Sequence, residues 1–562
     1  MRFRPKLFDL YKNYSKEQFY KDLMAGIIVG IVALPLAIAF GIASGVSPEK
    51  GLYTAIIAGF IISFFGGSKV QIGGPTGAFI VIVYGIVQEF GVTGLAIATL
   101  IAGIMLVAMG LLKLGSIIKF IPYPVVVGFT SGIAVTIFAT QIKDLFGMSI
   151  ESVPADFVQK WGVYAKHLDS INLASLGIGI ASIAIIALTP KFSKKIPGSL
   201  IAIVVMTVLV FVLREYFGMT GIETIGDRFS ISASLPKAER PVVDFATIQM
   251  LMPAAFTIAI LGAIESLLSA TVADGVINDR HNSNTELIAQ GIANMVAPIF
   301  GGIPATGAIA RTMTNINNGG RTPVAGIIHS VVLLMILLFL GSLTRHIPMA
   351  CLAGVLVIVA YNMSEWRTFR SLLKGQKSDI AVLVATFLLT VIFDLTIAIE
   401  IGLLLAVVLF LRRISGSAQI SVLKHTVDEA NYIEGNTDNE QLILPKGVEV
   451  YEIEGPFFFG VANKFEETMK MLGDKPKVRI IRMRKVPFID STGIHNLESL
   501  IKMSTKDKTQ ILLSGVTKKV HAALEKSGIP RAIGEENICS NIGEAIARAE
   551  VLVAKNKKDT KI

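Results

Sequence analysis

Cysteine is scarce in this chain of 562 residues, which contains Cys351 in an apolar stretch and Cys539 near the carboxyl end. Two isolated thiols supply neither a disulfide framework nor a metal quartet. The chain also lacks a glycine-rich loop ending in Lys-Ser or Lys-Thr, which would cradle the phosphates of ATP. We therefore expect no disulfide scaffold, no metal site and no ATP-driven chemistry.

The amino-terminal segment lacks the uninterrupted apolar run that precedes the cleavage site of a signal peptide. Residues 1–22 are basic and amphipathic, and we expect them to be a cytosolic segment that is kept. Hydrophobic residues make up 52% of the chain, and the mean hydropathy is +0.64. Near-continuous apolar blocks from residue 23 to residue 412 predict an α-helical polytopic membrane protein.

Fourteen membrane spans are predicted from these blocks. They lie near residues 23–44, 51–66, 76–90, 92–112, 124–142, 171–189, 199–217, 246–271, 285–300, 306–316, 322–344, 348–362, 378–394 and 396–411. The formal charge of +10 does not indicate nucleic-acid binding, because the lysines and arginines gather in alternate loops. That positive-inside pattern predicts a multi-pass protein of the inner (plasma) membrane. With an even number of spans, both termini face the cytosol.

Two nearly identical stretches about 230 residues apart interrupt the apolar blocks, at Gly74–Ala78 and Pro304–Ala308. The apolar runs that follow them are too short to span a bilayer, which takes about 20 residues. Paired interrupted segments are typical of a transporter's substrate site. Because each repeat holds an odd number of spans, seven, the second half enters from the opposite face. The two half-helices then meet near the midplane.

Two opposed helix amino termini form an anion site built mostly from backbone N–H groups. Thr76 and Thr306 can add hydroxyl donors. Arg311 is the only arginine or lysine in the two motifs, and a cation at this depth is costly. It either attracts the anion, directly or through its field, or extends along the short helix to the cytosolic headgroups.

Glu265 is the second costly residue, inside the apolar segment Gly262–Leu268. Desolvation of a carboxyl group favours its neutral form, so Glu265 is a candidate for proton coupling. The alternative is a neutral or arginine-paired structural carboxyl group.

Beyond residue 413 the sequence changes character, and we predict a linker at 414–446, a small α/β domain at 447–555 and a tail at 556–562. Strands are expected at 448–453, 478–483 and 510–513, and helices at 462–472, 492–503, 517–527 and 541–553. Asp490 or Ser491 is expected to cap the second of these helices. A phosphate on Ser491 would lie at that helix start, so a regulatory switch there is possible.

The motifs resemble the sulfate permease (SulP) family, the bacterial relatives of the solute carrier 26 anion exchangers. The matching residues are Ala33-Leu34-Pro35, Gly73–Gly77, Asn282–Leu287 with Gly291 and Asn294, and Ala305–Arg311. The carboxyl-terminal region resembles a STAS domain through Asp490-Ser491-Thr492-Gly493. The resemblance covers nearly the whole chain.

The resemblance implies a transporter domain at 23–413 with a seven-plus-seven inverted repeat, in which a core domain moves past a gate domain like an elevator. It also implies a homodimer with cytosolic STAS domains and a possible partner there. Glu265 matches a position linked to coupling by a proton or sodium, with no other cofactor, and Ser491 matches a phosphorylated serine. The family's substrate-binding positions correspond to Phe40, Ala78, Phe79, Thr306, Gly307, Ala308 and Arg311. The motif residues Thr76 and Gly77 complete the expected substrate-binding set.

We therefore expect no enzyme but a secondary active carrier of a small anion, by proton-coupled symport or anion exchange. Leu36 stands where many members of the family have glutamine, and sulfate, bicarbonate, chloride and dicarboxylates all remain open. Two other interpretations are a nucleobase permease of the same architecture and a membrane-tethered STAS signalling protein that senses an anion. Arg311 and the STAS domain disfavour the first. Flux measurement separates a carrier from a sensor.

Overall fold

The computed structural model divides the chain into two compact units, Met1–Ala406 and Val407–Ile562, which we describe separately. The described residues are 3–12, 14–116, 122–192, 197–219, 221–229, 235–238, 245–393, 395–417, 419–423, 426–428, 441–459, 461 and 476–559.

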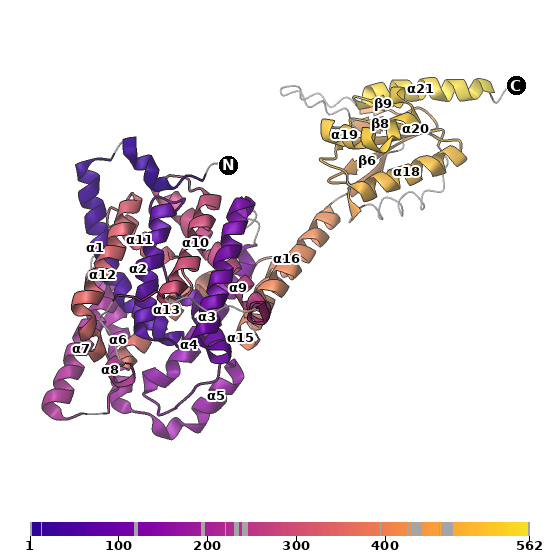
Figure 1. The fold of residues 1–562 in the computed structure, drawn as a ribbon. Helices are drawn as coiled ribbons and strands as arrows, with labels where there is room; N and C mark the ends of the chain where they lie inside the picture. The colour runs from indigo at the N-terminus through magenta and orange to yellow at the C-terminus, as the bar shows by residue number, and fades with distance from the viewer. Residues whose placement is uncertain are drawn as a thin grey trace. The chain divides into compact units, whose positions relative to one another are not determined.

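The first unit is built from helices (Figure 1), and its described residues include one two-stranded pair. Its helices are α1 (Lys16–Ala43), α2 (Pro48–Phe65), α3 (Ile80–Leu111), α4 (Tyr123–Phe146), α5 (Phe157–Lys166), α6 (Leu173–Phe192), α7 (Gly198–Phe217), α8 (Ile225–Arg228), α9 (Phe245–Ile277), α10 (Ser283–Val296), α11 (Ile309–Asn317), α12 (Pro323–Leu340), α13 (Met349–Met363), α14 (Trp366–Leu372) and α15 (Lys377–Ile392). Helix α16 (Leu395–Ser417) continues into the second unit. Among the described residues, eight helical segments are long and apolar enough to cross a membrane.

Two of the helical segments are short, as the sequence predicts. Helix α3 is broken at Gly91, whose backbone has φ 68° and ψ −175°, so that the stretch from Ile80 to Phe90 is separate from the next apolar stretch. Gly91 can adopt this backbone conformation because glycine has no Cβ atom. Helix α11 has nine residues and stops before Asn318. Both motifs therefore lead into half-length helices.

The helices of the first unit pack into two groups. We call α1, α2, α3, α9, α10, α11 and α12 the site group, and α4, α5, α6, α7, α13 and α15 the companion group. Within the site group, α3 and α10 approach so closely that a Cβ atom on Gly103 would lie 2.7 Å from the carbonyl oxygen of Gly291. Small residues at such crossings are the usual way in which membrane helices pack. The groups meet where α1 contacts α13 and α7, and where α3 contacts α4.

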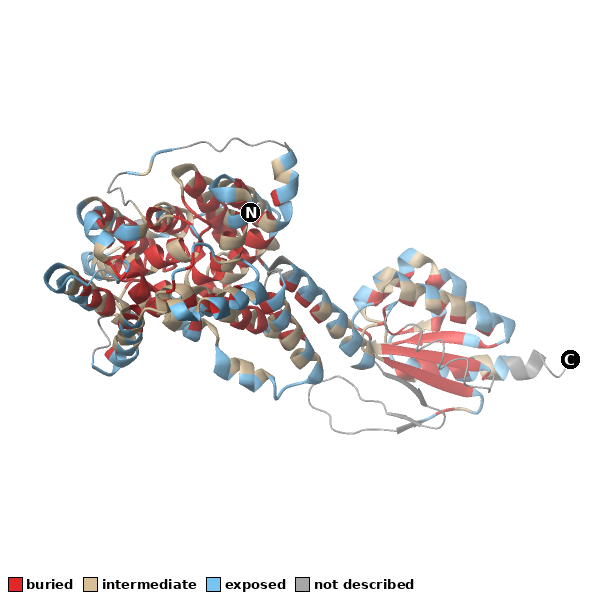
Figure 2. Cartoon of the chain, turned by 90° about the horizontal axis from the view of Figure 1, so that it is seen from below, coloured by how far each residue is buried: buried red, intermediate tan, exposed pale blue. Residues whose placement is uncertain are grey.

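Buried residues fill the interior of the helical unit (Figure 2). Many of its exposed residues are large and apolar. Leu173 and Phe192 at the two ends of α6 are 78% and 87% exposed, and Phe339 on α12 is 70% exposed. A water-soluble protein rarely exposes contiguous apolar surface of this kind. These side chains fit contact with lipid.

The second unit is an α/β domain with a five-stranded sheet in the order β3-β6-β7-β8-β9. The strands are β3 (Gln419–Leu423), β6 (Val448–Glu454), β7 (Val478–Lys485), β8 (Gln510–Ser514) and β9 (Ile538–Cys539), with a separate pair of β4 (Thr426–Asp428) and β5 (Gln441–Ile443). Strand β3 is antiparallel to β6, and the other neighbours are parallel. The helices are α18 (Ser491–Lys506), α19 (Lys518–Ser527), α20 (Ile529–Ile533) and α21 (Ile542–Asp559).

Both faces of this sheet are buried, as parallel strands require. One apolar cluster joins Tyr451 and Ile481 to Leu497 of α18, and another joins Val450 and Ile480 to the α21 side of the sheet. The three predicted strands are confirmed, as are the helices predicted at 492–503, 517–527 and 541–553. Strands β3, β4, β5 and β9 were not predicted from the sequence. The helix predicted at 462–472 lies outside the described residues, as does the middle of the predicted linker, 429–440. The described part of that linker holds the end of α16 and the strands β3, β4 and β5.

Candidate functional site

The two repeated motifs lie side by side. Strand β1 (Gly73–Gly74) pairs antiparallel with β2 (Thr306–Gly307), with Gly73 opposite Gly307 and Gly74 opposite Thr306. The Ala308 amide extends the pairing by donating to the Ile72 carbonyl at 2.9 Å. Segments about 230 residues apart in the sequence thus form one short ladder inside the site group.

Each strand leads directly into a helix start. A 3₁₀ turn (Gly77–Phe79) follows β1 and runs into α3, and α11 begins two residues after β2. Neither Thr76 nor Ala308, the residues before these helical stretches, caps the helix with its side chain. The first N–H groups of a helix have no partner within it, and they carry the positive end of the helix dipole. The ladder therefore holds two uncapped helix starts next to each other.

Arg311 is buried against the first motif. Its side chain is 3% exposed, and its guanidinium donates to the carbonyl oxygens of Gly73 at 3.3 Å and Pro75 at 2.5 Å. The alternative in which Arg311 extends to the headgroups does not fit this burial. A Cβ atom on Gly74 would lie 2.3 Å from Nη1 of Arg311, and Gly74 has a φ of +145°. Glycine at position 74 is therefore required both by the backbone and by the arginine.

Glu265 contacts the same ladder from α9. Its Oε2 accepts a hydrogen bond from the Thr76 hydroxyl at 2.9 Å, and the side chain is half-buried. One turn earlier on α9, the carbonyl oxygen of Gly262 accepts from the Thr306 hydroxyl at 2.9 Å. Both hydroxyl groups thus donate to α9 in this arrangement. Neither hydroxyl group is therefore free to donate to an anion in this arrangement, although the sequence led us to expect such donors.

The other predicted binding residues gather around this point. Phe40, Ala78 and Phe79 are 5%, 0% and 1% exposed and belong to one apolar cluster. Phe79 packs against Gly262 of α9, and Gly77 lies against Met363 of α13. The structure thus brings together residues from α1, α3, α9 and α11, and it places a companion-group helix beside them.

Several buried polar residues that hold the site had no assigned role in the sequence analysis. The Asn294 side chain exchanges two hydrogen bonds of 2.8 Å with the backbone of Ala305, just before β2. Gln71 donates to the Ser266 hydroxyl at 2.9 Å and fills the space beside Gly307. Thr312 accepts from the Ile72 amide at 3.1 Å. These residues could have been found in the sequence as isolated polar residues within apolar runs, because a buried polar side chain needs a hydrogen-bond partner.

Glu286 is a second buried carboxyl group that the sequence analysis passed over. It is 0% exposed, and its Oε2 accepts from the Gly67 and Ser68 amides at 2.8 and 3.0 Å. Gln290 donates to its other oxygen at 2.9 Å. These bonds attach α10 to the chain just ahead of β1. Glu286 thus fixes the direction from which the first motif enters the site.

In the second unit, Asp490 is the residue that caps α18. Its Oδ1 accepts from the Gly493 amide at 2.8 Å, and its Oδ2 accepts from the Phe459 amide at 3.1 Å. Ser491 is the first residue of α18 and is exposed. Phosphorylation of Ser491 stays a prediction.

Comparison with known proteins identifies the family. A model of the sulfate permease family matches residues 19–386, and a model of the STAS domain matches residues 441–545. The protein YvdB of Bacillus subtilis (strain 168), whose name as a sulfate transporter is itself provisional, is 42% identical over 94% of this chain and 97% of its own length. The bicarbonate transporter BicA of a Picosynechococcus species is 31% identical over 94% of each chain.

Solved structures share the fold. The murine Slc26a9 anion transporter in its inward-facing state has a TM-score of 0.87 and 20% identity, over 97% of this chain and 94% of that one. The transmembrane domain of a cyanobacterial BicA has a TM-score of 0.62 and 31% identity, over 70% of this chain and 98% of that one. These named proteins are transporters and not enzymes. The chain belongs to the sulfate permease family of membrane-embedded anion transporters and carries a STAS domain on its carboxyl-terminal side.

Proposed function

We propose that this protein carries a small inorganic oxyanion across the plasma membrane and holds it where α3 and α11 begin. The observation that supports this most strongly is the pairing of β1 with β2, which sets two uncapped helix starts side by side. Each helix start carries roughly half a positive charge, and its free N–H groups bind anions. Because the motif residues next to these helix starts are glycines and alanines, no large side chain of the motifs themselves covers the amides.

Arg311 strengthens the site in two ways. Its guanidinium cross-links the motifs by donating to Gly73 and Pro75, so that the α11 start stays registered with the α3 start. Its buried positive charge also favours an anion nearby, because charges interact strongly where water is excluded. In this proposal Arg311 acts through its position and its field rather than as a direct ligand.

Glu265 provides coupling. The carboxylate accepts a hydrogen bond from Thr76 at the end of β1, so a change in its charge alters the site directly. An ionised Glu265 opposes anion binding, whereas protonation or a bound sodium ion removes that repulsion. We therefore propose proton-coupled symport as the transport mechanism. Sodium-coupled symport and anion exchange are the two alternative mechanisms.

Alternating access follows from the two helix groups. We propose that the site group is the mobile core and the companion group is the gate, and that the core slides like an elevator. Fourteen crossings in an inverted seven-plus-seven repeat fit the helices, if α3 counts as two spans divided at Gly91 and α2, α10, α11, α15 and α16 count as one each. Both termini then lie in the cytosol. A homodimer and a STAS partner complete the proposal.

Sulfate and bicarbonate are the first substrates to test, since the curated relatives are named for these two anions. Leu36 is apolar and partly buried near the core, so it supplies no hydrogen bond to distinguish them. The test is uptake of radiolabelled sulfate, bicarbonate, chloride and fumarate into proteoliposomes, with and without a pH step or sodium. Saturable uptake of at least one oxyanion supports the proposal. Binding without any flux would instead make the protein a sensor.

A further inference from the structure

A polar cavity of about 230 Å³ lies between the two helix groups, away from the β1–β2 ladder. The site group contributes Ala39 of α1 and Tyr84 of α3 to its lining, and the companion group contributes Gln141 of α4 and Leu356 of α13. Helix α5 and the loop before it also border the cavity, where the Tyr84 hydroxyl donates to the Val153 carbonyl at 2.6 Å. Since a water takes about 30 Å³, this volume holds a small oxyanion with several waters.

Lys160 of α5 lines this cavity as a buried cation. Lys160 is only 4% exposed. Within the described residues, its ammonium group forms neither a hydrogen bond nor an ion pair. The ammonium nitrogen lies 5.8 Å from the centroid of the Tyr84 ring, and the Asp156 carboxylate favours the charged form of Lys160 from beyond ion-pair distance. A buried ammonium without a counter-ion is rare, since buried lysines are normally paired.

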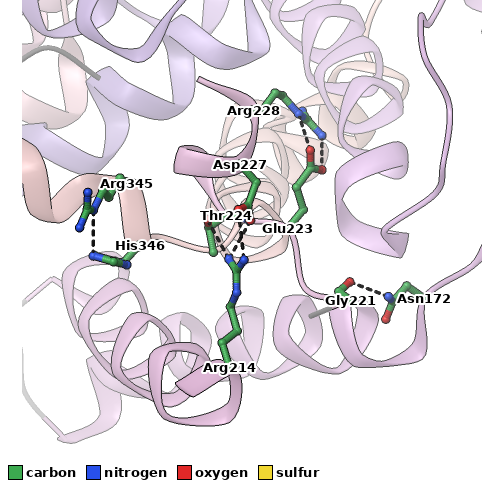
Figure 3. Close-up of polar contacts among 9 residues, drawn as sticks. All are labelled: Asn172, Arg214, Gly221, Glu223, Thr224, Asp227, Arg228, Arg345 and His346. Carbon is green, nitrogen blue, oxygen red and sulfur yellow. Dashed lines mark hydrogen bonds and ion pairs between the residues drawn. The ribbon is translucent and has the colours of Figure 1, made fainter. Parts of the chain in front are cut away.

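The carboxylates around the cavity already have other partners or lie in water. Arg228 also lines the cavity and pairs with Asp144 at 2.8 Å and with Glu223 at 2.5 Å, and the second of these pairs is drawn in Figure 3. Asp156 caps α5 by accepting from the Gln159 amide at 2.8 Å. Glu151 is exposed at the rim. The positive charge of Lys160 is thus left to face the cavity.

A second cation adds to this charge. Lys143 of α4 lines the same cavity and is half-buried, and it has no ion pair within the described part of the chain. The cavity lining includes Ala39, which precedes Phe40, one of the predicted substrate-binding residues. The cavity is therefore a cationic chamber that borders the neighbour of one predicted transport-site residue.

We infer that this cavity is a second anion site, in which Lys160 and Lys143 capture an inorganic oxyanion on its way to or from the site at α3 and α11. The inference rests on the proposed transport function for its role, but not for the binding itself. By the charge pattern of the loops, the α5 face is the external one. The chamber raises the local concentration of substrate next to the boundary along which the two helix groups slide.

The binding depends on pH in a defined direction. Burial lowers the pKa of Lys160 to about 8. The ammonium is charged below that pH and loses its charge above it, so anion capture is strong at pH 7 and weak at pH 9. Burial raises the pKa of the Tyr164 hydroxyl on the same helix, which stays neutral over this range. The other charged groups facing Lys160 are Asp144, Glu151, Asp156, Lys143 and Arg228, and Tyr84 is the remaining titratable one.

The first test is sulfate transport from each face, in proteoliposomes sorted by orientation. Lys160→Gln should raise the KM for sulfate offered on the α5 face about tenfold, because the charged hydrogen bond from Lys160 to the bound sulfate is lost. The KM on the opposite face should not change. Lys160→Arg should have the wild-type KM at pH 7. In the wild type the KM should rise between pH 7 and pH 9, and in Lys160→Arg it should stay constant, because the guanidinium keeps its charge. Lys166→Gln, which neutralises an exposed lysine at the end of the same helix, is the matched control.

The second test does not need transport. In crystals of the full chain grown with selenate, the selenium anomalous signal should show a peak beside Lys160 that is absent from Lys160→Gln crystals. A peak without any flux keeps this inference and overturns the proposed function. Flux with no peak and with an unchanged KM in Lys160→Gln overturns this inference and leaves the proposed function standing.

Discussion

A buried arginine is expensive in a membrane, by about 2.5–3.5 kcal/mol on insertion scales. Arg311 offsets that cost by donating to the backbone carbonyls of Gly73 and Pro75. The contact is possible because Gly74 has no side chain. The arginine and the glycine are therefore one structural feature, although they are distant in the sequence.

Gly74→Ala should destabilise the protein by about 1–3 kcal/mol, since it forces a non-glycine residue to a φ of +145° and pushes a Cβ atom into Arg311. The measurement is the thermal unfolding midpoint of the purified protein in detergent. Gly85→Ala in α3 is the control, because a Cβ atom there meets nothing within 4 Å. Equal midpoints for the two variants would show that the arginine contact is not as close as described.

Glu265→Gln should abolish uptake driven by a pH gradient and leave anion binding measurable, because the amide keeps its contact with Thr76 but cannot carry a proton. The assay is radiolabelled uptake with and without an imposed gradient, beside equilibrium binding. Glu89→Gln, an exposed carboxyl group in α3, is the control. Wild-type uptake by Glu265→Gln would remove Glu265 from the coupling role.

At the scale of elements, the sequence predicted what depends on local pattern. The apolar runs that stop near Phe90 and Ile316 predict short helices, and the structure has a break at Gly91 and the nine-residue α11. The costly residues Glu265 and Arg311 were also recognisable, because a charge in an apolar run is unusual in any fold.

The partners of these residues were not predictable. A two-residue strand such as β1 has too few residues to show a period-2 pattern, and its pairing with β2 is set by packing between distant segments. The hydrogen bonds from Thr76 to Glu265 and from Thr306 to Gly262 arise in the same way. Sequence therefore located the motifs, while only the structure showed that the threonine hydroxyls donate to α9.

Helix capping gives a prediction for the second unit. Asp490→Ala should remove the cap of α18 and destabilise its first turn by about 1 kcal/mol. A loss of about 1 kcal/mol makes local opening about fivefold more frequent, so hydrogen exchange of the Gly493 amide in the full-length protein should be about fivefold faster. Lys502→Ala, an exposed substitution further along α18, should leave this exchange rate unchanged. An unchanged rate in Asp490→Ala would mean that the cap adds no local stability.

At the scale of the whole membrane unit, the division into two helix groups predicts where motion is needed. A thiol cross-linker that joins Tyr84→Cys in α3 to Val153→Cys before α5 bridges the two groups and should stop transport. The control bridges Lys69→Cys to Asp279→Cys, replacing an ion pair of 2.8 Å between segments of the site group, and should leave transport intact. Uptake that survives the first cross-link would contradict sliding between the groups.

The central claim is that the transported anion sits where α3 and α11 begin, held by backbone N–H groups. The most direct test is to locate bound selenate in crystals by anomalous diffraction. Selenate is first shown to compete with the transported anion for uptake. The account predicts a selenium peak within hydrogen-bonding distance of the amides of Gly77, Ala78 or Ile309, beside the β1–β2 ladder. A competing selenate bound elsewhere in the protein, with no peak at that ladder, would contradict it.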